Sequence, residues 1–152
     1  MVTVQDKKEI FDAPIIFATI GVNEGYNHDN EDKIDFCETV QNICASYHNI
    51  TGAYVSFVVS KTTTVYNKDC GCPKGGEVTY TLLAEPNPFF VYNKEKFEEY
   101  SKHIKKVLVI IANTYRQTTI RITETKSSLT TECKFLYDEK VWWIWKKIEL
   151  FQ

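Results

Sequence analysis

The chain has 152 residues, of which 43% are apolar and 14% are aromatic, which is enough apolar material for one continuous core without a disulfide framework. Its 18 basic and 20 acidic side chains give a formal net charge of −2. This balance lacks the positive footprint that binding to a phosphate backbone requires, so we do not expect nucleic acid as a partner.

The N-terminal segment and the cysteine count favour a cytoplasmic protein. Charged residues between Asp6 and Asp12 occupy the positions where a signal peptide would carry its apolar segment. The longest apolar run, residues 107–112, is far shorter than the ~20 residues that cross a bilayer, so no membrane contact is expected. The five cysteines, an odd number, are then expected to be free thiols.

A strand and a helix are the first predicted elements. Residues 15–20 form a nearly continuous apolar run between Pro14 and Gly21, which is typical of a central strand covered on both faces. Asp29 or Asn30 is placed to cap a helix that runs to about Tyr47. The apolar positions of this helix are three and four residues apart and form one packing stripe: Phe36, Cys37, Val40, Ile43, Cys44 and Tyr47.

A long hairpin and a second helix follow. From Gly52 to Val65 the pattern alternates with a period of two, and it does so again from Val78 to Leu83, which predicts two antiparallel strands. Asn93 is expected to cap a helix whose apolar stripe comprises Phe97, Tyr100, Ile104, Val107, Leu108, Ile111 and Tyr115. Val109 and Ile110 lie off this stripe and need another partner, which suggests a second subunit.

The C-terminal third predicts further strands. Ile120 and Ile122 alternate with polar residues, and residues 129–135 give a fifth strand after a turn at Lys126. The tail, residues 140–151, is most simply a final strand that carries the three tryptophans Trp142, Trp143 and Trp145.

Strand, helix, strand, strand, helix, strand is the split βαβ order, in which both helices cover one face of an antiparallel sheet. In this order of elements the chain resembles the ferredoxin-like superfold over about residues 14–125, followed by a C-terminal β extension over about residues 128–150. No repeat or linker divides the chain, so we predict a single α+β domain over residues 1–152.

The face of the sheet that the helices leave uncovered is the main candidate site. The period of two places Tyr54, Ser56, Thr79 and Arg121 on this open face. A guanidinium among hydroxyl groups is suited to bidentate capture of a carboxylate or a phosphate, which predicts an anionic small-molecule ligand. The alternative is a solvated face or a subunit interface in which Arg121 pairs with Glu85 or Glu124.

The sequence holds two further candidates for chemistry. Cys70 and Cys72, which flank Gly71 in the hairpin turn, could bind a metal or form a redox pair. No second pair completes a zinc site, and the alternative is an ordinary hairpin turn whose thiols have no role. Glu24 and His28 in the loop after the first strand, together with Glu85 after the hairpin, are candidates for proton transfer.

The sequence is consistent with three functions. The first is an oligomeric protein that binds a small anionic ligand, with catalysis possible. The second is an interaction or inhibitor module, with a phage or mobile element as one source, that uses the tryptophan tail and the tip of the hairpin as its contact surface. The third is a metal-binding or thiol-redox protein built on Cys70 and Cys72. No sequence motif names a reaction or a cofactor.

Overall fold

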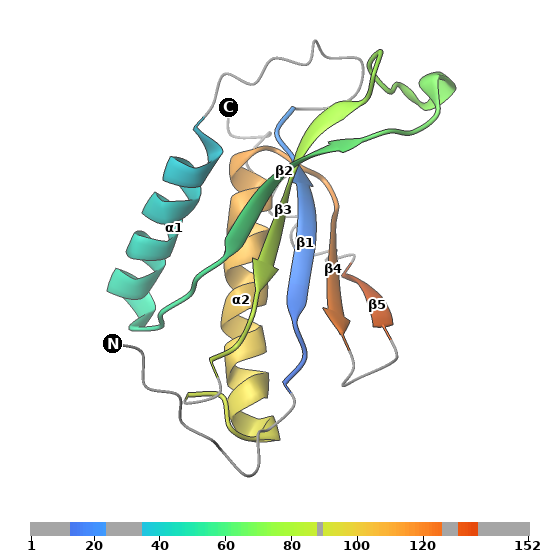
Figure 1. The fold of residues 1–152 in the computed structure, drawn as a ribbon. Helices are drawn as coiled ribbons and strands as arrows, with labels where there is room; N and C mark the ends of the chain where they lie inside the picture. The colour runs from blue at the N-terminus through green and yellow to red at the C-terminus, as the bar shows by residue number, and fades with distance from the viewer. Residues whose placement is uncertain (1–12, 24–34, 88–89, 126–130, 137–152) are drawn as a thin grey trace, which may run out of the picture.

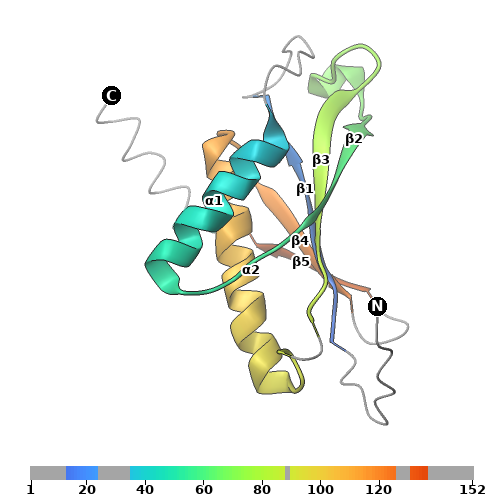
Figure 2. The same ribbon diagram turned by 60° about the vertical axis from the view of Figure 1, so that its left-hand side comes forward.

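The structure is a computed structural model that describes residues 13–23, 35–87, 90–125 and 131–136, the last range by its backbone alone. Within these residues one antiparallel sheet has the strand order β2-β3-β1-β4-β5 (Figure 1). Its strands are β1 (Ile16–Gly21), β2 (Val58–Thr64), β3 (Glu77–Ala84), β4 (Ile120–Thr125) and β5 (Thr131–Leu136). The helices α1 (Phe36–Thr51) and α2 (Lys94–Thr114) both lie on one face of the sheet (Figure 2). This arrangement confirms the predicted α+β fold with split βαβ order.

Strand β1 lies at the centre of the sheet, between β3 and β4, but only one of its faces is fully buried. Ile16, Ala18 and Ile20 are buried beneath the helices, whereas Thr19 is exposed on the opposite face. The apolar run therefore marks the central position correctly, but the prediction that both faces are covered does not hold within the described residues.

Helix α1 begins and ends later than its sequence pattern suggested. The side chain of Asp35 caps it by accepting a hydrogen bond from the backbone N–H of Glu38 at 3.0 Å, while Asp29 and Asn30 lie outside the described residues. The helix ends at Gly52, whose left-handed backbone (φ 75°) lets its N–H donate to the carbonyl of His48. Glycine adopts this conformation without steric cost.

The packing stripe of α1 is narrower than predicted. Phe36, Val40 and Tyr47 are buried and Cys44 is half-buried against the core, but Cys37 is exposed. Each residue turns the helix by about 100°, which carries Cys37 from the position of Phe36 past the edge of the stripe. The prediction that Cys37 is a packing residue was wrong.

Strands β2 and β3 form the predicted hairpin, joined through the short 3₁₀ helix η1 (Lys68–Cys70). β2 starts at Val58 rather than near Gly52, since Val58 is the first residue that pairs with β3, opposite Leu83. Residues 52–57 connect α1 to this strand without pairing in the sheet.

Helix α2 supplies most of the cover over the sheet. Asn93 caps it as predicted, by accepting a hydrogen bond from the N–H of Lys96 at 2.8 Å. Ile104, Leu108 and Ile111 are fully buried against Ile122 and the other aliphatic side chains of the sheet. Ile110 remains 40% exposed. The residues of the tryptophan tail lie outside the described part of the chain.

Candidate functional site

The open face of the sheet carries a continuous set of hydroxyl groups. We call this set the hydroxyl face; its members come from three adjacent strands and are Thr19, Ser60, Thr62, Thr64, Thr79 and Thr81. Their side chains share a face because they lie at alternate positions and pair across the strands. Threonine suits this place because its branched side chain fits a strand while its hydroxyl stays polar.

Hydrogen bonds fix several of these hydroxyls. Thr79 lies 2.8 Å from Thr62 and 2.9 Å from Thr64, measured between hydroxyl oxygens, and Thr19 lies 2.9 Å from Thr81. Thr79 is buried, whereas Thr19 is exposed. The bonded hydroxyls form a rigid polar surface, because each bond restricts the rotation of the two side chains that it joins.

Arg121 lies at the edge of the hydroxyl face. It is the register partner of Thr19 in β1, so the two side chains leave the sheet on the same side, and Arg121 is exposed there. The structure therefore places two of the four predicted ligand-binding residues, Arg121 and Thr79, on the same face of the sheet, on the strands that flank β1. Among the open-face positions of β1 to β4, Arg121 is the only base.

The other two predicted ligand-binding residues lie outside the sheet, in the segment that connects α1 to β2. Tyr54 and Ser56 precede β2, and both are exposed. The ring of Tyr54 stacks on His48 of α1, with ring centroids 4.0 Å apart and an angle of 23° between the rings. The sequence pattern treated this connecting segment as part of the strand, whereas aromatic stacking directs Tyr54 to the helix instead.

The predicted proton-transfer residues are dispersed. Glu24 and His28 lie outside the described residues. Glu85 follows β3 and is exposed, and it is close enough to influence Tyr100 of α2. Burial, and after it the negative charge of Glu85, raises the pKa of Tyr100 to about 12.

Cys70 and Cys72 lie at the far end of the hairpin. The first is exposed at the end of η1, and the second is buried. Within the described residues no three His, Cys, Asp or Glu side chains are grouped as metal ligands require. Both cysteines are free thiols in the structure.

A carboxylate that the sequence analysis missed lies beside the hydroxyl face. Glu77, the first residue of β3, alternates with Thr79 and Thr81 and so belongs to the same face. A Cβ atom placed on Gly21 would lie 3.0 Å from Glu77 Oε1 and 2.9 Å from Gln117 Oε1. The alternation of β3 would have identified Glu77 had the strand been started one residue earlier.

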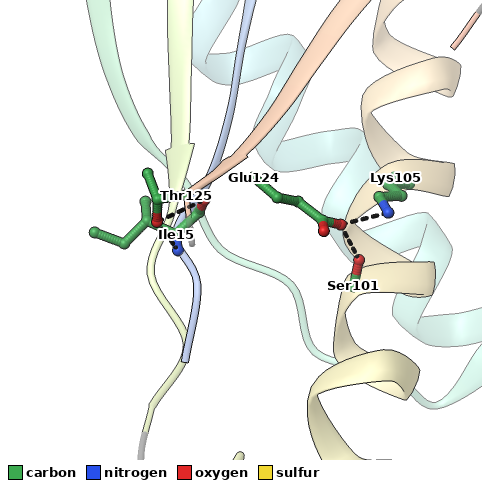
Figure 3. Close-up of polar contacts among 5 residues, drawn as sticks. All are labelled: Ile15, Ser101, Lys105, Glu124 and Thr125. Carbon is green, nitrogen blue, oxygen red and sulfur yellow. Dashed lines mark hydrogen bonds and ion pairs between the residues drawn. The ribbon is translucent and has the colours of Figure 1, made fainter. Parts of the chain in front are cut away.

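A second polar cluster, on the helix side of the sheet, holds α2 to β4. Ser101 donates a hydrogen bond to Glu124 Oε1 at 2.8 Å, and Lys105 forms an ion pair with the same oxygen (Figure 3). At the neighbouring position, Thr125 accepts a hydrogen bond from the backbone N–H of Ile15 at 2.8 Å (Figure 3). These contacts tie β4 to α2 and to the residue before β1, and they hold Glu124 Oε1 on the side opposite the hydroxyl face.

Fold and site together define a helix-covered antiparallel sheet with a polar, sparsely charged open face. A model of the SAM lyase family matches residues 14–133, which include β1 to β4, both helices and the start of β5. The chain therefore belongs to the SAM lyase family. No curated protein sequence matches it.

Solved structures agree with this fold. A phage SAM lyase in complex with S-methyl-5'-thioadenosine superposes with a TM-score of 0.53 at 8% sequence identity, covering 88% of this chain and 96% of that one. A phage SAM lyase in the apo state gives the same values. At this identity the likeness concerns the fold alone. Neither helix in the described part of the chain is long and apolar enough to cross a membrane.

Proposed function

We propose that this protein is a SAM lyase, which binds S-adenosylmethionine and releases S-methyl-5'-thioadenosine. The observation that carries the proposal is the family match, because it extends over the whole split βαβ core. The product that we propose is the molecule bound to the phage enzyme of the same fold.

The proposed reaction breaks the bond between the sulfonium sulfur and the γ-carbon of the methionyl part. The bonding electron pair passes to sulfur, and the sulfonium becomes the neutral thioether of S-methyl-5'-thioadenosine. A lyase adds no water, so the four-carbon fragment supplies the replacement electrons itself, from its own carboxylate or from a C–H bond that loses its proton. The positive charge on sulfur disappears during this step. A surface with few fixed charges does not stabilise the charged substrate relative to the transition state, so it does not slow the reaction.

The hydroxyl face and Arg121 offer groups that fit this substrate. The methionyl carboxylate matches the planar, bidentate guanidinium of Arg121, and the neighbouring hydroxyls can bond to the ribose. The sequence analysis predicted an anionic ligand with a carboxylate or a phosphate. S-adenosylmethionine has the carboxylate, but it is not an anion, since it also carries a sulfonium and an ammonium. Glu85 remains a candidate for proton transfer at the rim.

The direct test is to incubate the purified protein with S-adenosylmethionine and to quantify S-methyl-5'-thioadenosine and the four-carbon product over time. We expect Arg121→Ala to lower kcat/KM by about 10- to 100-fold, the range of a lost charge-assisted hydrogen bond. Lys106→Ala, which removes the same charge from the exposed side of α2, should leave it unchanged. A wild-type protein that forms no thioether above the spontaneous rate would exclude the proposed function.

We also infer that the protein is a homo-oligomer assembled through its open face. An apolar row crosses this face beside the hydroxyl face and consists of Phe17, Val58 and Leu83, which pair across three strands. Val58 is 64% exposed. An apolar row next to a polar surface is typical of an interface in which a second copy closes a ligand site.

A further inference from the structure

The side-chain amide of Gln117 has a fixed orientation. Its nitrogen Nε2 donates to two backbone carbonyls, that of Asn23 at 2.8 Å and that of Tyr115 at 3.0 Å. An amide nitrogen has two donor hydrogens, and both are used here. The hydrogen-bond network therefore leaves the carbonyl oxygen Oε1 facing Gly21, at 2.9 Å from the place where a Cβ would stand.

The Glu77 carboxylate approaches the same point. Its Oε1 lies 3.0 Å from that Cβ position, so the two oxygens are less than about 6 Å apart and one nitrogen placed between them can bond to both. Among the described residues no hydrogen bond or ion pair is made by the Glu77 carboxylate or by Gln117 Oε1. Both oxygens therefore keep the capacity to accept a hydrogen bond from a ligand.

Gly21 lets the ends of the Glu77 and Gln117 side chains approach the backbone of β1 closely. Its backbone does not adopt the left-handed conformation that requires glycine, and a glycine inside a strand weakens it. Conformation therefore does not explain the glycine here. Close approach does, because a Cβ at this position would clash with the side-chain oxygens of Glu77 and Gln117.

The charge of this pair selects the chemical class of the donor that it can bind. A carboxylate and a carbonyl oxygen accept hydrogen bonds and favour a cation, which excludes phosphates and carboxylates from this point. S-adenosylmethionine offers three groups for comparison. The sulfonium has a positive charge but no N–H to donate, and the adenine amine has N–H groups but no charge. The α-ammonium has both. We infer that Glu77 and Gln117 form an ammonium subsite that holds the α-amino group of the substrate, an inference that rests on the proposed function.

In the proposed reaction this subsite would position the four-carbon fragment that departs from sulfur. Glu77 would supply the negative charge, and Gln117 would supply a second, neutral acceptor that fixes the orientation of the α-ammonium group. Asn23, whose carbonyl helps to orient Gln117, has a side-chain nitrogen that is buried without a hydrogen-bond partner in the described part of the chain.

The test compares the binding of S-adenosylmethionine with that of its deamino analogue, in which the α-ammonium is replaced by hydrogen. Titration calorimetry of the wild-type protein should show about 10- to 100-fold tighter binding of S-adenosylmethionine. Glu77→Gln, which removes the charge and keeps the shape, should reduce this preference to less than about threefold by weakening only the ligand that has the ammonium. Glu95→Gln, an exposed carboxylate at the start of α2, is the matched control and should keep the preference.

Gly21→Ala is an independent second variant. Its methyl group meets only the ends of two side chains, so the fold should persist, as circular dichroism can verify, while the two acceptors must move apart. We expect about a tenfold loss of affinity for S-adenosylmethionine and little change for the deamino analogue.

The outcomes separate this inference from the proposed function. If the wild-type protein cleaves S-adenosylmethionine but binds both ligands equally well, or if Glu77→Gln weakens both to the same degree, the ammonium subsite is wrong and the lyase activity stands. If the wild-type protein neither binds nor cleaves S-adenosylmethionine, the proposed function fails and the subsite fails with it.

Discussion

Arg116 adopts a backbone conformation that glycine usually provides. Its φ of 55° is left-handed, and it follows the C-terminus of α2, where the N–H of Arg116 donates to Asn113 and the N–H of Gln117 donates to Ala112. This pair of bonds is the Schellman arrangement that ends many helices, with glycine preferred at the residue that Arg116 occupies. The steric cost of the left-handed conformation falls on Arg116. This residue is adjacent to Gln117, and Gln117 is the one that we place in the ammonium subsite.

We therefore expect Arg116→Gly to raise the free energy of unfolding by about 0.5–1 kcal/mol, because glycine relieves the left-handed strain by more than it adds to the entropy of the unfolded chain. Urea unfolding followed by circular dichroism measures this difference. Lys106→Gly, inside α2, is the control and should lower stability by about 1 kcal/mol. A loss of stability in Arg116→Gly would show that contacts of the arginine side chain outweigh the strain.

Single residues also show where sequence reasoning reached its limit. Alternation placed Arg121 and Thr79 on the open face because both lie inside regular strands. It misplaced Tyr54, since a period of two has no meaning outside a paired strand and the ring stacks on His48 instead. The approach of Gln117 to Gly21 could not be predicted, because residues 96 positions apart meet only through the crossing of α2 and β1.

Helix α2 and the end of β3 are coupled through an ionisable side chain. Burial and the charge of Glu85 raise the pKa of Tyr100 from 10.0 to about 12. Between these two pH values the unfolded chain has released the phenolic proton that the folded chain still holds. The unfolded state then binds fewer protons, so the free energy of unfolding falls as the pH rises through this window, and the contribution is fully present below pH 10.

Tyr100→Phe removes this titration, so its stability should fall less steeply than that of the wild-type protein from about pH 10 upward. Urea unfolding at a series of pH values from about 8 to 11 gives the two slopes. Glu85→Gln should give an intermediate slope, because it removes the second cause of the shift and leaves burial in place. Equal slopes for the wild-type protein and Glu85→Gln would contradict the influence of Glu85, and equal slopes for all three proteins would contradict the raised pKa of Tyr100.

Elements with one dominant signal were predicted best. The stripe and the cap of α2 and the paired alternation of β3 with β2 from Val58 onward each depend on neighbours in sequence, and the structure confirms them. The start of α1 was missed because several residues before it can cap a helix, and only the tertiary position of Phe36, stacked 4.1 Å from Tyr80, decides for Asp35. Local propensity cannot distinguish among such caps.

At the scale of the whole molecule, the sheet has one covered face and one face that combines the apolar row with the hydroxyl face. The helices bury the first, where Ile16, Leu82 and Ile122 are almost wholly inaccessible. On the second, Val58 at the edge strand remains 64% exposed. A second copy seated on this row would remove apolar surface from water and enclose the neighbouring polar groups, which is what a small-molecule site needs in order to exclude solvent.

We expect the wild-type protein to be an oligomer by native mass spectrometry and by light scattering, and Val58→Asp to shift it to a monomer. The reason is that the new carboxylate would be buried without a partner at the interface, while in the monomer it stays solvated and leaves the fold intact. Val65→Asp provides the matched control, because Val65 is 74% exposed and lies just beyond the end of β2, outside the apolar row.

If the site is completed by a second copy, Val58→Asp should also lose lyase activity in proportion to the monomer fraction. Raising the protein concentration should then restore the oligomer and the activity together. A wild-type monomer that is fully active would show that one chain completes the site alone.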